Sequence, residues 1–130
     1  MNSGNGSSSQ IKVRQTPLSS TKPKYQLTFD TLLVDFGKMR RGERREYTFG
    51  FQNTGTDPIV IDIVTSCDCT TLTWPEAKVI KPGDRDQIHA VFDSTEKEQG
   101  ETVDIDVILR ERDERGNPIV YTVQYKFDLE

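Results

Sequence analysis

The chain has 130 residues, of which 33% are hydrophobic, and its formal net charge is −4. This length supports one domain with a modest core, and no apolar run approaches the roughly 18 residues that a membrane-spanning helix needs. Residues 24–130 carry 14 bases against 21 acids, a balance that argues against a basic nucleic-acid-binding domain.

The first 23 residues are rich in Ser, Gly and Asn and poor in large apolar side chains. Such a segment buries too little apolar surface to offset the entropy lost on ordering. We therefore expect a flexible N-terminal tether over residues 1–23 and a single domain over residues 24–130. A tether of this kind is typical of the region next to a removed secretory or lipoprotein signal. We therefore expect an extracytoplasmic protein, periplasmic or on the cell surface. The membrane contact that we expect is through a lipid anchor that was lost with the signal.

From Tyr25 onward, apolar and polar residues alternate with a period of two, which is typical of strands with one buried face. Turn residues such as Asn-Thr-Gly-Thr-Asp-Pro at 53–58 and Gly-Asn at 116–117 separate the alternating runs. The pattern predicts strands over residues 32–36, 47–51, 59–63, 70–74, 88–92, 103–109 and 119–127. About seven short strands at this spacing favour an all-β fold, an antiparallel immunoglobulin-like β-sandwich.

The inward-facing residues can be read from the same alternation. The pattern places the following side chains in the core: Tyr47, Phe49, Phe51, Ile59, Ile61, Ile63, Ile88, Ala90, Phe92, Val103, Ile105, Val107, Leu109, Ile119, Tyr121, Val123, Tyr125 and Phe127. His89, the only histidine, then points away from the core.

A basic hairpin loop is expected around Gly42. Its five bases are Lys38, Arg40, Arg41, Arg44 and Arg45, against the acids Glu43 and Glu46. One interpretation is a solvated turn whose charges protect a sheet edge. The other is a contact with an anion such as phosphate, an acidic glycan or a lipid headgroup. No aromatic residue interleaves with these bases, as a surface for single-stranded nucleic acid requires.

Both cysteines lie in the segment TSCDCTTLTWP, residues 65–75. In a regular strand, Cys67 and Cys69 project from one face about 6.5–7 Å apart, whereas a disulfide needs Cβ atoms about 3.8 Å apart, so a direct bond requires a sharp kink. Two thiols and one histidine are too few for a structural zinc site. The pattern favours two structural cysteines packed near Trp74 at one end of the sandwich. Copper(I) binding and redox exchange with a partner are the alternatives.

Trp74 also has two interpretations. A lone tryptophan in a small sandwich is typical of the core or of a plug over an open end, with Pro75 ending the strand behind it. An exposed Trp-Pro pair could instead anchor a partner. A cysteine nucleophile paired with His89 is disfavoured, because the predicted strand turns His89 outward. The sequence lacks the common hydrolase, phosphate-loop and zinc-protease motifs, and we expect no enzyme and no cofactor.

Several short segments resemble one bacterial family. They are Asp35-Phe36-Gly37, Gly42-Glu43, Phe51-Gln52-Asn53-Thr54-Gly55, Ser66 to Thr70, Trp74-Pro75 and Pro82-Gly83-Asp84. In this order, over about residues 32–110, they are similar to domain of unknown function 1573, an immunoglobulin-like module akin to the Hydin-type domains. The resemblance implies a secreted or lipid-anchored protein of the bacterial envelope, and it implies no activity. The chain departs from the family pattern at Asp68, where the family has Gly, and at Asp84, where it has Glu.

The sequence thus predicts a non-catalytic binding or spacer module of the bacterial cell envelope. We expect contact with a protein or another envelope component, through edge-strand pairing or loops, and no nucleic-acid partner. The candidate binding residues are Cys67, Cys69, Trp74, Arg40, Arg41, Arg44 and Arg45, with no metal site. The alternative is a thiol-dependent copper or redox protein that acts through Cys67 and Cys69.

Overall fold

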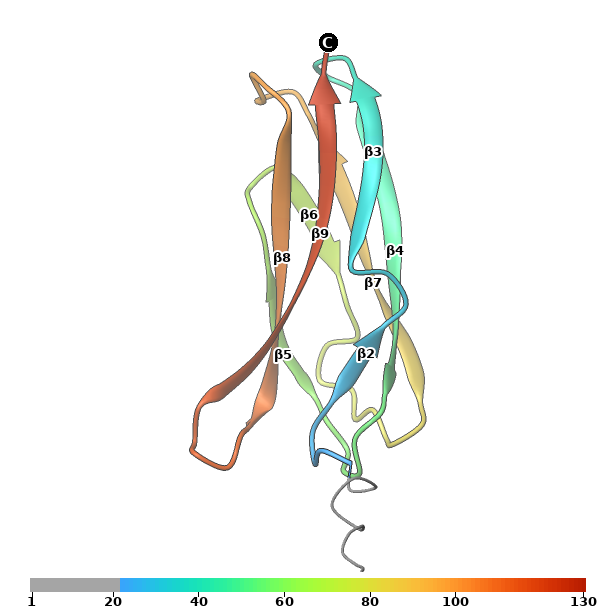
Figure 1. Ribbon diagram of the computed structural model, residues 1–130, viewed down its shortest axis with the longest axis vertical. Helices are drawn as coiled ribbons and strands as arrows, with labels where there is room; N and C mark the ends of the chain where they lie inside the picture. The colour runs from blue at the N-terminus through green and yellow to red at the C-terminus, as the bar shows by residue number, and fades with distance from the viewer. Residues whose placement is uncertain (1–21) are drawn as a thin grey trace, which may run out of the picture.

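The computed structural model describes residues 22–130, so the tether expected over residues 1–23 lies outside the described part except for its last two residues. The described chain folds into eight strands (Figure 1). They are β2 (Leu27–Phe29), β3 (Leu33–Met39), β4 (Arg44–Asn53), β5 (Ile61–Thr65), β6 (Thr70–Thr73), β7 (Arg85–Asp93), β8 (Glu101–Arg112) and β9 (Pro118–Leu129). Over residues 22–130, no helix is available that could span a membrane.

The strands form two four-stranded sheets that face each other. Their orders are β2-β4-β7-β6 and β3-β9-β8-β5. All pairs are antiparallel except β3 with β9, which is parallel. The all-β immunoglobulin-like sandwich predicted from the alternation is confirmed, and the parallel pair is the exception to the predicted antiparallel arrangement.

The first strand of the sandwich is divided between the two sheets. β2 pairs with β4 in one sheet, and after residues 30–32 the chain crosses over so that β3 pairs with β9 in the other. This division gives eight strands rather than about seven. The alternation did not predict β2, because its three residues are too few to carry a periodic signal.

The core lies between the sheets and consists of the residues that alternate inward on the long strands. Those fully buried include Phe49, Phe51, Ile88, Phe92, Ile105, Val107, Val123 and Tyr125. These positions confirm the predicted inward faces of β4, β7, β8 and the second half of β9. Ile119 and Tyr121, in the first half of β9, are half-buried and pack against the core.

The predicted inward position of Ile63 is wrong. Ile63 is exposed and Val64 is buried in its place. The register of β5 against β8 shifts between Ile61, which pairs with Leu109, and Ile63, which pairs with Ile108. A bulge of this kind adds one residue and reverses the alternation beyond it. The run of Ile and Val gave no sign of the bulge, because these side chains fit either face.

All four sheet edges are short or irregular. The edge strands β2 and β6 have three and four residues. The other two, β3 and β5, contain register shifts, between Asp35 and Lys38 and between Ile61 and Ile63. Short and bulged edges hinder the addition of another strand. The loops are therefore better placed than the edges to make contacts with a partner.

Candidate functional site

Cys67 and Cys69 are joined by a disulfide in the connection between β5 and β6. Their Cα atoms are 5.1 Å apart, within the usual range for disulfides. The chain turns here, and the Thr70 N–H donates to the Cys67 carbonyl at 3.0 Å. The spacing argument against a direct bond assumed a straight strand, and it fails because this segment is a turn.

The disulfide corrects two further expectations about the cysteines. The sequence predicts buried thiols, but both residues are half-buried and oxidised. In this form neither sulfur is a thiolate, which is the form that binds copper or another soft metal. Asp68, which stands where the family pattern has Gly, does not have a positive φ; among the described residues other than glycine only Ala77 does. Asp therefore fits this turn without backbone strain.

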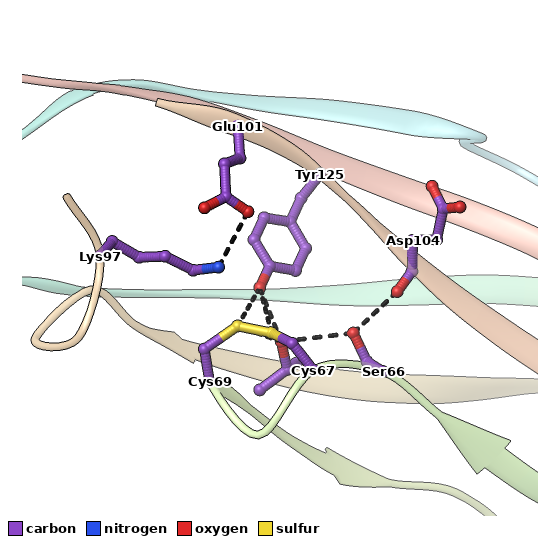
Figure 2. A network of polar contacts seen from close by, with 8 residues as sticks. Ser66, Cys67, Cys69, Lys97, Glu101, Asp104 and Tyr125 are labelled. Atoms are coloured by element: carbon purple, nitrogen blue, oxygen red, sulfur yellow. Dashed lines mark hydrogen bonds and ion pairs between the residues drawn. A yellow bond between two sulfur atoms is a disulfide. The ribbon is translucent and has the colours of Figure 1, made fainter. Parts of the chain in front are cut away.

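Two hydroxyl groups lie against the disulfide, and Figure 2 shows that of Tyr125 pointing at the sulfurs. The hydroxyl oxygens of Tyr125 and Thr70 are 2.6 Å apart. Thr70 Oγ1 lies 3.3 Å from Cys67 Sγ, and the Tyr125 oxygen lies 3.5 Å from Cys69 Sγ. Because the sulfurs of a disulfide carry no proton, the hydroxyls are the donors in these contacts.

Tyr125 reaches the disulfide from the centre of the core. It lies on β9, is fully buried, and packs against Phe36 and Phe92 at ring centroid distances of 5.2 and 4.9 Å. Burial raises the pKa of Tyr125 to about 12, so its hydroxyl keeps its proton at neutral pH. The alternation predicted Tyr125 only as a core residue. The available signal was the phenol itself, since a buried tyrosine hydroxyl usually has a hydrogen-bond partner.

A surface hollow of about 370 Å³ borders the disulfide on the Cys69 side. Its lining contains Cys69 but not Cys67, together with three acids: Asp68, Asp93 and Glu96. The only basic group drawn beside the disulfide in Figure 2 is Lys97, which is paired with Glu101 at 2.9 Å. Asp93 is paired with Arg44 at 4.0 Å, so Asp68 and Glu96 are the acids that make the approach to Cys69 negatively charged.

The disulfide contributes little to stability through chain entropy. The ring that it closes contains three residues, Cys67 to Cys69. For a loop of this length the chain-entropy relation gives about 1.6 kcal/mol, against about 3 kcal/mol for a loop of 15 residues. A role as a structural clamp is thus weakly supported, and the environment of the sulfurs becomes the more informative feature.

Trp74 does not cover the cysteines, contrary to the sequence prediction. Cys69 precedes β6 and Trp74 comes after it, so the four residues of the strand lie between them. At about 3.3 Å per residue their Cα atoms are roughly 16 Å apart. Trp74 is half-buried, packs against the core, and borders a second hollow with Lys78 and His89. Its buried Nε1 has no hydrogen-bond acceptor among the described residues.

Of the basic residues, Arg40 and Arg41 lie on the turn between β3 and β4, whereas Arg44 and Arg45 begin β4. The predicted hairpin loop is wrong, because β3 and β4 belong to different sheets and the turn crosses between them. Arg44 pairs with Asp93 at 4.0 Å and Arg45 with Glu43 at 3.6 Å. Arg40 and Arg41 are exposed, and within residues 22–130 neither makes an ion pair. The charges of Arg44 and Arg45 are therefore compensated by acidic neighbours, whereas those of Arg40 and Arg41 are free to contact an anion.

Ser94 holds the basic turn in place, and sequence reasoning missed it. This fully buried residue accepts a hydrogen bond from the Gly42 N–H at 2.9 Å. Its hydroxyl donates to the Glu43 carbonyl at 2.8 Å, and its own N–H donates to the same carbonyl. Gly42 has a φ of 97°, which favours glycine. No sequence signal marked Ser94, because a serine after a strand is usually a loop residue.

The disulfide and the basic turn lie on either side of the end of β7. Asp93, the last residue of β7, donates its N–H to the Cys69 carbonyl and pairs through its carboxylate with Arg44. His89 is elsewhere, on the outer face of the sheet, where its ring nitrogens contact Thr48 and Glu46 at 2.8 and 2.9 Å. The predicted outward orientation of His89 is confirmed.

Solved structures share the fold of this chain. A protein of unknown function from Porphyromonas gingivalis W83 is 20% identical, with a TM-score of 0.64 over 92% of this chain and 52% of that one. The human ASH/PapD-like domain 7 of CEP192 is 12% identical, with a TM-score of 0.61 over 92% of both chains. The Vibrio cholerae protease VesB is 13% identical, with a TM-score of 0.59 over 79% of this chain and 32% of that one.

These identities show the fold alone. The chain spans about half of the P. gingivalis protein (52%) and about a third of VesB (32%). No curated protein matches the sequence. A family model does match residues 27–120, and its description is "Protein of unknown function (DUF1573)". That match covers most of the chain, and the protein therefore belongs to the DUF1573 family of immunoglobulin-like domains of unknown function.

Proposed function

We propose that this domain is a non-catalytic binding module of the bacterial cell envelope that contacts a negatively charged partner through its basic turn. The observation that carries the proposal is the rigid display of two uncompensated arginines. Arg40 and Arg41 lie on a turn that the buried Ser94 fastens with hydrogen bonds to Gly42 and Glu43. A binding surface that is already ordered loses less conformational entropy when a partner binds.

The shape of the sandwich favours contact through loops rather than edges. Every edge strand is short or carries a register shift, so an extended segment would find few consecutive backbone groups with which to pair. Of the two modes that the sequence allows, edge-strand pairing and loop contact, the loop mode is better supported. The same fold also occurs as one part of longer chains, as expected of a module or spacer.

The extracytoplasmic location is supported by the disulfide. Disulfides persist in oxidising compartments such as the periplasm and the cell surface, and they are rare in the cytosol. Cys67 and Cys69 are only partly buried and Cys69 borders a surface hollow, so cytosolic reductants would reach the bond. The location and the anionic partner together make up the proposal.

The test compares two charge-matched variants. Arg40→Gln/Arg41→Gln removes the two available charges, whereas Arg110→Gln/Arg115→Gln removes two exposed arginines near the β8–β9 loop at the opposite end of the sandwich. Binding to a poly-glutamate peptide and to vesicles with anionic headgroups is measured at two salt concentrations. We expect the first variant to lose most of its binding and the second to keep it, with attraction that fades as salt screens the charges. Equal losses in both variants would show a nonspecific charge effect and contradict the proposal.

A third variant tests the rigid display itself. Ser94→Ala leaves every charge in place but removes the hydroxyl that ties Gly42 to Glu43. We expect weaker binding with unchanged salt dependence. Unchanged affinity in a folded Ser94→Ala protein would show that the order of the turn is irrelevant. Binding to the acidic peptide and binding to the vesicles are measured separately. Comparison of the two affinities shows which class of partner the domain prefers.

A further inference from the structure

We propose that the Cys67–Cys69 disulfide is a thiol–disulfide exchange site that accepts two electrons from an external dithiol, with Cys69 as the sulfur that is attacked. This activity is independent of the basic turn and goes beyond binding. Three observations carry it: both cysteines are only partly buried and Cys69 borders a surface hollow, the bond closes a ring of three residues, and two hydroxyl groups contact its sulfurs.

The asymmetry of the site identifies the attacked sulfur. Cys69 borders the surface hollow, whereas Cys67 does not. Cys67 Sγ has the shorter hydroxyl contact, 3.3 Å to Thr70 Oγ1. An incoming thiolate thus meets Cys69, and Cys67 leaves on the side where a hydroxyl donor lies. Thiol–disulfide exchange is faster when the leaving thiolate is stabilised.

The hydroxyl pair can always supply one proton donor to the sulfurs. Tyr125 and Thr70 carry two hydroxyl protons, and their mutual contact at 2.6 Å uses one of them. The neighbouring Ser66 hydroxyl donates to the Asp104 carbonyl at 2.8 Å, so it does not compete for the sulfurs. Whichever of the pair donates to the other, the second remains free to donate to a sulfur.

The exchange proceeds in two balanced steps. A thiolate of the external dithiol forms a bond to Cys69 Sγ while the Cys67–Cys69 bond breaks, and Cys67 leaves as a thiolate that takes up a proton from solvent. The second thiol of the reagent loses its proton and attacks the reagent sulfur of the mixed disulfide. The bond to Cys69 breaks, and Cys69 leaves as a thiolate that takes up a proton. The reagent is oxidised to a disulfide, and the protein is reduced to two thiols.

The charge of the hollow selects the class of substrate. Asp68 and Glu96 line the approach to Cys69, and neither makes an ion pair with a described residue. They repel anionic thiols and attract cationic ones. The expected substrate is a dithiol with neutral or positively charged surroundings, such as a redox protein with basic residues around its thiols. A negatively charged thiol such as glutathione is disfavoured.

The first experiment measures whether the folded protein exchanges. The reduction rate by dithiothreitol is followed in native buffer by thiol trapping and mass spectrometry, beside the global unfolding rate from denaturant extrapolation. We expect reduction that is first order in dithiothreitol and much faster than unfolding. A reduction rate that equals the unfolding rate, and that saturates with reagent, would overturn the proposal.

The second experiment tests the route through the hollow. Reduction rates by cationic cysteamine and anionic glutathione are normalised to thiolate concentration and expressed as a ratio. Asp68→Asn/Glu96→Gln should lower this ratio about fivefold, as for two unit charges at about 7 Å in water at physiological salt. Glu98→Gln/Glu114→Gln, which removes two exposed acids that do not line the hollow, is the matched control. An equal ratio in all three proteins would exclude the proposed route.

The third experiment tests the hydroxyl donors. Thr70→Val removes the donor nearest Cys67, and Thr70→Val/Tyr125→Phe removes both donors. In the reduced protein, both variants should raise the pKa of the more acidic thiol, measured by thiolate absorbance, and slow reduction about three- to tenfold. A purely structural role would change stability without moving the thiol pKa. An unchanged thiol pKa in both variants would show that the hydroxyl groups do not stabilise the leaving thiolate, and would contradict this part of the proposal. Loss of binding to anions in the arginine variant, with normal exchange, would separate this activity from the proposed function.

Discussion

Asn53 and the Cys67–Cys69 disulfide lie at opposite ends of the sandwich and order the loops there by different chemistry. Asn53 ends β4 and is 1% exposed. Its side-chain NH₂ donates to the carbonyls of Asp57 and Ile80 at 3.0 and 2.9 Å, and its oxygen accepts from the Gly55 N–H at 2.9 Å. One buried amide thereby joins two loops, and every partner is a backbone group.

Gly55 completes this end of the molecule. A Cβ at Gly55 would lie 2.5 Å from the Lys24 carbonyl oxygen and 2.8 Å from the Gln26 nitrogen. The segment that precedes β2 therefore packs directly against the backbone of this turn, with the Thr54 N–H donating to the Gln26 carbonyl. The Asn53-Thr54-Gly55 motif thus has a structural explanation in burial and close packing.

The two ends differ in the groups that they leave open. The Asn53 end also borders a surface hollow, of about 550 Å³, but the polar atoms of the Asn53 side chain all have hydrogen-bond partners. At the disulfide end the cysteines are partly buried and Cys69 borders an acidic hollow. The contact between the Tyr125 and Thr70 hydroxyls uses only one of their two protons, so the other can be donated to a sulfur. The Asn53-Thr54-Gly55 motif therefore orders its loops without a reactive group. The Cys67–Cys69 segment instead contains a reactive bond that solvent can reach. Substitutions at each end test this contrast through their different effects on stability.

Asn53→Ala should lower the free energy of unfolding by about 3 kcal/mol. It leaves the Gly55 N–H and the Asp57 carbonyl without a partner among the described residues. It also removes one of the two hydrogen bonds to the Ile80 carbonyl, which keeps the one from the Ile59 N–H. Chemical denaturation at pH 7 measures the loss. Asn53→Asp is the matched control: its carboxylate can still accept from Gly55 but repels the two carbonyls, so it should be at least as unstable at pH 7. Protonation restores one donor, and Asn53→Asp should recover partly below about pH 4. A loss under about 1 kcal/mol for both variants would contradict this view of Asn53.

Tyr125 should make stability fall at alkaline pH. Its pKa is raised to about 12 in the folded protein, against 10.0 for an unperturbed tyrosine. The contribution of the protonated phenol is fully present below pH 10 and is lost as pH rises through about 12. Two pH units correspond to about 2–3 kcal/mol. Denaturation of wild type and Tyr125→Phe at several pH values from about 8 to 12 measures the difference, and parallel curves for the two proteins would refute the prediction.

Removal of the disulfide should have a smaller effect on stability. Cys67→Ala/Cys69→Ala should cost about 1–2 kcal/mol, as expected for a ring of three residues with half-buried sulfurs. Denaturant titrations of the variant and of wild type, both at pH 7, measure it. A loss above about 4 kcal/mol would instead identify the disulfide as a structural clamp like the Asn53 amide.

The arginine variant should leave stability almost unchanged. Arg40 and Arg41 are exposed and make no ion pair with any described residue, so Arg40→Gln/Arg41→Gln should change the free energy of unfolding by less than about 0.5 kcal/mol. Thermal unfolding beside the binding assay checks this. A large loss would mean that the basic turn has a structural role, and binding losses could not then be assigned to charge.

Much of the fold was predictable from the sequence, because the signal for a half-buried strand is local. The alternation on β4, β7, β8 and β9 identified the core residues, since side chains along a strand face opposite sides by geometry. The bulge at Ile61–Ile63 and the brief strand β2 were not predicted. Both depend on which strand lies alongside, and that partner is distant in the sequence.

The candidate site was predictable in composition but not in arrangement. The sequence alone showed that the cysteines are two residues apart and that the four arginines fall within residues 40–45. The tertiary fold was needed to show that the cysteine segment bends into a turn, where a disulfide becomes possible. It also brought Tyr125, 56 residues beyond Cys69, into contact with the sulfurs, and Ser94 under the basic turn. These contacts could not be predicted because they depend on sheet pairing and on packing across the core, which no local pattern encodes.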